Sequence, residues 1–287
     1  MKTGFTFKGV HTSTMGVTMR SKSRPILPEV RQSLLTLPSA DGTLDYSAAN
    51  EYGRSMSEDR MFTVLLYVSA ADVFDLQCKA SKLAVWLMGS GELIFDDMPE
   101  AVWEASVFDG IDFVPESQGR KALITVNFRV QPFSHAAFDV LDGITLDSDI
   151  HLSAMVPLNI SSTMEYSFTG TSFTFDAFNY GSAPVRAKFI ITPLTDAPGE
   201  ISLLCGERGI SVNCISFTGG SGIEINTEKC TVIQNKVNAS GLVTGQFFEL
   251  APGSNSVTFT AETKQEYKIN LSYTPRFIYN ADWQSYE

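Results

Sequence analysis

The strongest constraint on the fold is a two-residue alternation of apolar and polar side chains that recurs in short segments along a chain of 287 residues. In residues 122–130, Ile124, Val126, Phe128 and Val130 are apolar, and the side chains between them are polar. This period is that of a β-strand with one buried face. Residues 5–17 and 61–68 also read as strands, so a mainly β protein is expected.

One segment has helical spacing instead. Apolar residues recur three or four positions apart from Val73 to Leu87, and Gly89 follows as a helix-ending signal. Ser69, with Asp72 three residues later, resembles a capping box and predicts the start of the helix. We therefore expect one α-helix in the first part of the chain.

Residues 20–60 interrupt the strand pattern. Pro25, Pro28 and Pro38 exclude regular structure at several points, and Asp41-Gly42 is a hairpin turn signal. The segment is expected to form a long ordered loop or a hairpin arm. A stretch of this length without elements of its own is usually functional in a compact domain.

The second half of the chain lacks helical spacing. Short strand candidates are separated by Gly, Pro, Asn and Ser, which is typical of a β-sandwich or jelly roll. The candidates are Tyr166 with Phe168, Phe173 with Phe175, and residues 185–192, 201–204, 210–212, 223–225, 231–233, 246–250, 257–259 and 267–273. We expect two domains, residues 1–133 and residues 134–287.

Charge excludes one class of function. The chain has 21 Lys and Arg against 32 Asp and Glu, a net charge of -11, which argues against a protein that neutralises phosphates. No specific nucleic-acid binding is expected. No apolar run is long enough for a signal peptide or a membrane span, so we expect a chain made in the cytoplasm that does not insert into membranes.

Catalytic and metal-binding patterns are weak. The three histidines, His11, His135 and His151, lie far apart, and no Gly-x-Ser-x-Gly motif occurs. The carboxylates of Asp96, Asp97, Glu100 and Glu104 are candidates for paired acid–base groups, but a solvated turn explains them better. The loop at residues 219–222 lacks the lysine of a phosphate-binding loop. We expect no enzyme, no metal and no cofactor.

The four cysteines form no C-x-x-C pair, and a chain of this size needs no disulfide framework. They are interpreted as small buried side chains. The cysteines are Cys78, Cys205, Cys214 and Cys230.

Several motifs, read in order, resemble those of phage distal tail proteins. They are Phe5-Thr-Phe-Lys-Gly9 followed by Gly16, the Leu37-Pro-Ser-Ala-Asp-Gly42 turn after a Pro-rich loop, the single helix, Val130-Gln-Pro-Phe133, and Gly245-Gln-Phe-Phe-Glu-Leu-Ala-Pro-Gly-Ser-Asn255. The chain departs from the family where Ser39-Ala40 precede Asp41-Gly42, because relatives commonly carry an Arg in this turn.

The resemblance implies an amino-terminal β-sandwich with one helix and an extended hairpin, followed by a carboxy-terminal galectin-like sandwich. It further implies a structural protein of the virion tail tip. Six copies form a ring that continues the tail tube, lets DNA pass through its lumen, and binds tube, tip and often receptor-binding proteins.

A closed ring needs two unlike patches on each copy. Arg20, Lys22 and Arg24 are close enough to line one side of an extended segment, and we expect them, with Asp41 and Gly42 of the turn, at the ring interface. A solvated loop is the competing interpretation.

The alternative function is a carbohydrate-binding adhesin that recognises the host surface. Tyr279, Trp283 and Tyr286 would form its aromatic platform, or would dock a terminal segment on a core.

Overall fold

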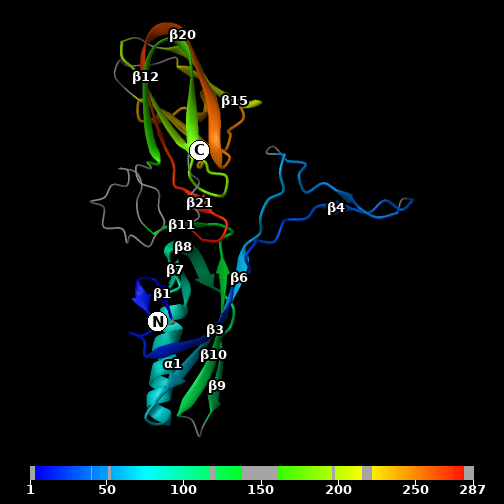
Figure 1. The fold of residues 1–287 in the computed structure, drawn as a ribbon, viewed down its shortest axis with the longest axis vertical. Coiled ribbons are helices and arrows are strands. Elements are labelled where there is room, and N and C mark those ends of the chain that lie inside the picture. Colours follow the sequence, from blue (N-terminus) through cyan, green and yellow to red (C-terminus); the bar gives the residue numbers. More distant parts are fainter. Residues whose placement is uncertain are drawn as a thin grey trace. The chain divides into compact units, whose positions relative to one another are not determined.

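The computed structural model describes residues 4–39, 41–50, 53–116, 120–137, 161–195, 198–214 and 222–280. Its chain divides into two compact units, Met1–Ala137 with the segment that begins at Ile278, and a second unit that begins at Phe138. Figure 1 shows that both units consist mainly of strands, and only the first has an α-helix among its described residues. The predicted mainly β fold is confirmed.

The first unit contains one continuous path of strands in the order β2-β1-β7-β8-β10-β6-β3, with β9 beside β10 and β11 beside β8. Its elements are β1 (Phe5–Phe7), β2 (Val10–His11), β3 (Val17–Ser23), β4 (Leu34–Leu35), β5 (Leu44–Asp45), β6 (Arg60–Ser69), α1 (Val73–Leu87), β7 (Gly89–Phe95), β8 (Met98–Val107), β9 (Asp112–Glu116), β10 (Lys121–Val130) and β11 (Ser134–Ala136).

Alternation determines which side chains enter the core of this unit. Strand β10 buries every second residue, and its antiparallel register places Val126 opposite Val64 and Phe128 opposite Phe62. The ring centroids of Phe128 and Phe5 are 5.5 Å apart, so β10 and β1 meet across the core although they are not neighbours in the sheet.

Helix α1 covers this core with one face, through Leu76, Leu83, Trp86 and Leu87. The helix begins after Asp72, whose carboxylate accepts a hydrogen bond from the Asp75 backbone N–H at 2.8 Å. The expected start at Ser69 is therefore wrong, because that residue ends β6 and the chain needs three further residues to turn.

The second unit is an antiparallel sheet of strand order β18-β17-β16-β13-β20-β14-β15-β19, with β12 also beside β20. Its elements are β12 (Thr163–Asn179), β13 (Lys188–Pro193), β14 (Gly199–Cys205), β15 (Arg208–Cys214), β16 (Ile223–Asn226), β17 (Thr231–Gln234), β18 (Val237–Asn238), the 3-10 turn η3 (Ser240–Leu242), β19 (Val243–Gly245), β20 (Gly253–Ser272) and β21 (Arg276–Phe277).

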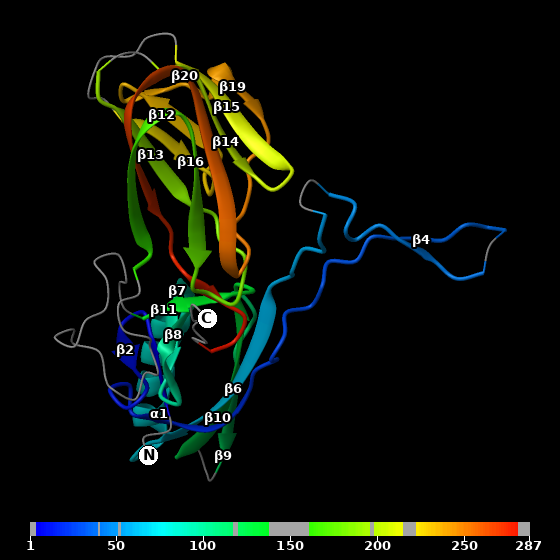
Figure 2. The same cartoon turned by 45° about the horizontal axis from the view of Figure 1, so that its top comes forward.

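Two long strands organise this sheet. Strand β20 pairs with β12 over nearly its whole length, and on its other side with β14 through residues 257–261 and with β13 through residues 267–272. Figure 2 shows the resulting curl. The short candidates around Phe168 and Phe173 belong to one strand, because an irregularity between Gly170 and Ser172 lets the pairing continue.

Two smaller expectations also fail. Residues 246–250 form only an isolated bridge, from Leu250 to Val185. Cys214 is buried, but Cys78 and Cys230 are exposed, so these two are not core side chains.

Candidate assembly interface

A hairpin arm is the most conspicuous feature of the first unit. The chain leaves the sheet at the end of β3, forms the short β4–β5 hairpin, and returns at the start of β6 (Figures 1 and 2). Backbone hydrogen bonds of 2.7 Å join Arg31 to Met56 and Glu58 to Glu29, and the Arg31 side chain binds the Glu58 carboxylate at 2.7 Å. These bonds join the two limbs along part of their length and confirm the expected arm.

The arm carries apolar side chains that its own chain leaves exposed. Their exposed fractions range from 41% for Leu37 to 68% for Ile26. The full set is Ile26, Leu27, Val30, Leu34, Leu35, Leu37, Leu44 and Tyr46. Exposed apolar surface of this extent on one segment is typical of an interaction site.

Arg60 anchors the base of the arm. It is the first residue of β6 and only 2% exposed. Its guanidinium donates hydrogen bonds to the backbone carbonyls of Pro25 (3.1 Å), Ile26 (2.9 Å) and Pro132 (2.9 Å), and to that of Ile278. Burial lowers the pKa of Arg60 to about 10, which leaves it charged at neutral pH.

The basic residues expected at the ring interface bind groups of their own chain. Lys22 and Arg24 both bind the Asp97 carboxylate, Arg24 at 2.7 Å, and Arg24 lies over the Phe95 ring with Cζ 4.6 Å from its centroid. Burial of Asp97 raises its pKa, but the hydrogen bonds from Lys22 and Arg24 outweigh that effect, and the net pKa is lowered.

Arg20 is separated from this cluster. A register shift between Met19 and Ser21 interrupts its pairing with β6, and its guanidinium lies over the Tyr67 ring at 4.4 Å. Asp41 and Gly42 are exposed in the turn between β4 and β5, where Gly42 has a φ of +81° that favours glycine. The structure thus brings together two of the five residues, and the ring-contact role of all five stays a prediction.

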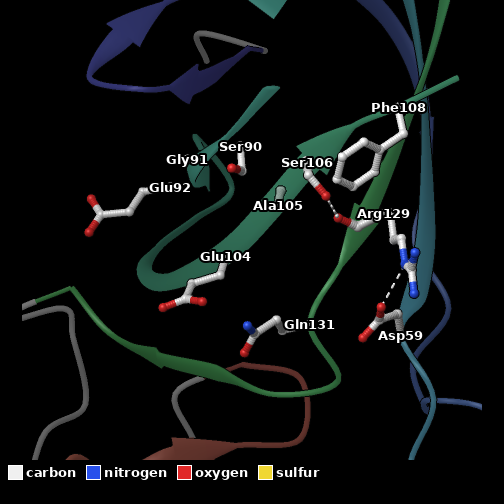
Figure 3. A pocket seen from close by; sticks show the side chains of 10 residues that line it. All are labelled: Asp59, Ser90, Gly91, Glu92, Glu104, Ala105, Ser106, Phe108, Arg129 and Gln131. Carbon is white, nitrogen blue, oxygen red and sulfur yellow. Dashed lines mark hydrogen bonds and ion pairs between the residues drawn. The ribbon is translucent and has the colours of Figure 1, made fainter. Parts of the chain in front are cut away.

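An open polar hollow of about 550 Å³ lies beside the start of β6 (Figure 3). Glu92 and Glu104 stand directly opposite each other on β7 and β8, and Arg129 binds Asp59 at 2.6 Å on the other side. Like charges placed opposite each other weaken strand pairing. The hollow contains no pairing of a carboxylate with a nucleophile or a histidine among its lining residues.

Asp96 and Asp97 of the other candidate carboxylates have structural partners. Asp96 contacts His11 Nε2 at 3.1 Å, and Asp97 binds the two cations described above. Among the described residues no group of three or more His, Cys, Asp or Glu side chains is arranged to hold a metal. No described helix has the length and apolar character needed to cross a membrane.

Of the three aromatic side chains expected to form a carbohydrate-binding platform, only Tyr279 lies in the described part of the chain. Tyr279 packs against Trp103 with ring centroids 6.5 Å apart, in the core of the first unit. Trp283, Tyr286, His151 and the 219–221 part of the glycine loop lie outside the described residues. Tyr279 therefore docks a late segment on a core.

Comparisons with known proteins give the class. Residues 11–130 match the family described as phage tail protein RIFT-related domain, and residues 180–277 match the family described as siphovirus-type tail component, C-terminal domain. A search of curated proteins gives no significant match.

Solved structures share the fold. The crystal structure of Dit (gp 19.1) of phage SPP1 aligns with 96% of this chain and 99% of its own at 14% identity and a TM-score of 0.66. Two structures of the phage P2 baseplate in its activated conformation also contain chains that align with this one. In the structure with Ca, 94% of this chain and 98% of that chain are covered, at 8% identity and a TM-score of 0.38. In the structure with Sr, 93% and 97% are covered, at 8% identity and a TM-score of 0.37.

Both matched segments are parts of phage tail proteins, and together they extend over both units; the chain is a phage tail component. It belongs to the siphovirus distal tail protein (Dit) family, as its motifs predicted. It is a structural protein of the virion tail tip or baseplate and not an enzyme.

Proposed function

We propose that six copies of this chain form a ring at the distal end of the tail tube, through whose lumen DNA leaves the particle. Residues 1–133 form the ring, and residues 134–287 form a peripheral galectin-like domain. The tail tube protein binds on one side of the ring, and a tail tip protein, with a receptor-binding protein in some particles, binds on the other.

The main observation behind the proposal is the set of exposed apolar side chains on the arm. A monomer in water would expose its apolar side chains permanently, whereas a ring would bury them between copies. The four carbonyl contacts of Arg60 hold the base of the arm in place, so the arm is presented to a partner at low entropic cost.

The overall acidity fits a channel for DNA. Residues 61–133 carry 5 basic and 10 acidic side chains, and a lumen of this charge would repel DNA and let it slide without binding. The SPP1 protein is described as a paradigm of the hub adsorption apparatus in phages that infect Gram-positive bacteria, which supports the same role for this chain.

Negative-stain imaging of the purified full-length chain, over a series of concentrations, tests the proposal. Rings with a central hole and six-fold symmetry are expected. Particles of single-chain size at every concentration, alone and with the tube and tip proteins, would contradict it. A glycan array tests the adhesin alternative, which no described aromatic platform favours; a specific hit would revive it.

A further inference from the structure

A second apolar surface lies on helix α1. The residues at its outward positions, Phe74, Cys78, Ser81, Val85 and Met88, are spaced by four, three, four and three residues, and we call them the helix stripe. Phe74 is 79% exposed, Val85 74% and Met88 72%. This spacing places them along one side of the helix, opposite the face that packs on the core.

The helix stripe extends beyond the helix at one end. Gly89 pairs with Val107 in the antiparallel β7–β8 pair, so Met88 and Phe108, which is 72% exposed, follow at the same end of that pair. Phe108 is also one of the residues that line the hollow in Figure 3. The helix stripe and Phe108 together form an apolar surface without a covering element in the described part of the chain.

We infer that the helix stripe receives the arm of a second copy of this chain. The inference rests on the proposed ring and specifies its contact. A ring contact joins two unlike patches, and this unit exposes two, one on the arm and one on α1. Figures 1 and 2 show the arm leaving the first unit on the side away from α1, so the arm does not cover the helix stripe of its own copy.

Charge supports the same occupant. Lys82 lies four residues after Cys78 and three before Val85, so it is exposed beside the helix stripe, and the arm carries exposed Asp41 and Asp45 near its tip. Opposite charges beside two apolar patches fix the register of a contact more than they add to its affinity.

The exposed thiol of Cys78 provides a direct test because it lies on the helix stripe. In the full-length chain, Cys230→Ser removes the other exposed thiol, and Leu35→Cys places one on the arm. Treatment of the assembled protein with a short bismaleimide should then give a ladder of covalent oligomers that extends to the full ring. Adding Cys78→Ser should abolish the ladder.

The outcomes separate the inference from the proposed ring. The arm thiol is also placed at Leu27 or Leu37 instead of Leu35. If rings form but none of these variants gives a Cys78-dependent ladder, the inference is overturned and the proposed ring is not affected. A product that stops at the dimer would mean reciprocal exchange of arms and would overturn both. If no ring forms, the proposed function fails and the inference fails with it.

A substitution provides an independent measurement. Val85→Asp should raise the concentration at half-assembly by roughly tenfold or more, because a charge would be buried in the contact. The matched control, Val237→Asp, makes the same substitution at an exposed valine of the second unit, away from the helix stripe and the arm, and should leave assembly unchanged. Equal effects of the two variants, with both folded by circular dichroism, would contradict the contact.

Discussion

The guanidinium carbon of Arg60 lies 5.1 Å from the centroid of the Trp103 ring. The cation thus sits against the aromatic core of the first unit while its N–H groups bind backbone carbonyls from three separate segments. All four of these hydrogen bonds go to backbone carbonyls, and none goes to a carboxylate. The buried charge is stabilised by carbonyl dipoles and a π-face, and the base of the arm is thereby joined to the core.

Arg60→Met should destabilise the first unit by about 3 kcal/mol, because it leaves buried carbonyl groups without donors. Urea unfolding followed by tryptophan fluorescence measures the loss. Arg31→Met is the matched control, since it removes an ion pair on the exposed part of the arm and should barely shift the midpoint. Equal shifts for both variants would show that Arg60 does not anchor the arm.

Asp97→Asn should loosen the base of the arm in a pH-dependent way. The folded-state pKa of Asp97 is lowered, so its stabilisation is present above the unfolded pKa of about 3.9 and is lost as pH falls through the folded value. The difference in melting temperature between wild type and Asp97→Asn should be constant above about pH 5 and shrink on further acidification. Asp109→Asn, at an exposed position, is the control. A difference in melting temperature between wild type and Asp97→Asn that does not depend on pH would contradict the stabilising role of the Asp97 contacts with Lys22 and Arg24.

Asp72→Ala should cost about 1 kcal/mol by removing the N-cap of α1. Asp72→Ser, which retains an acceptor, should recover most of this stability. The urea midpoint of the first unit is the measurement. If Ser69→Ala proved more damaging than Asp72→Ala, the helix would begin at the position expected from the sequence instead.

Gly181→Ala should destabilise the second unit by about 2 kcal/mol, because the added Cβ would lie 2.4 Å from the Arg276 backbone oxygen. Gly241→Ala, where nothing lies within 4 Å, is the matched control. Thermal unfolding of the two variants distinguishes them, and a neutral Gly181→Ala would mean that the close approach of backbone at this point is not required.

Local periodicity was enough to predict the helix and several strands of the first unit, β6 and β10 among them, but not β9 or the last residues of β3. Strand β10 alternates cleanly because one of its faces is buried. The length of β12 and β20 was not predictable in the same way. Gly170 and the polar residues near Gln265 resemble a turn in sequence, yet they face each other within the paired strands, where an irregularity absorbs the mismatch.

The interface residues show the limit of sequence reasoning more sharply. Lys22 and Arg24 stood out by charge, but their partner Asp97 lies more than 70 residues away. Arg60 gave one signal, a lone cation at the start of an apolar strand. Its partners at Pro25, Pro132 and Ile278 are distant in sequence. They are backbone carbonyls, which every residue has, so no residue type in the sequence identifies them.

The mass of the assembled particle tests the central claim most directly. Native mass spectrometry of the full-length chain should give six times the chain mass of 31.4 kDa. The same chain with Leu34, Leu35 and Leu37 replaced by Ser should fold and remain at the mass of one copy. A wild-type chain that is monomeric with its tail partners present, or an arm variant that assembles as well as wild type, would contradict the account.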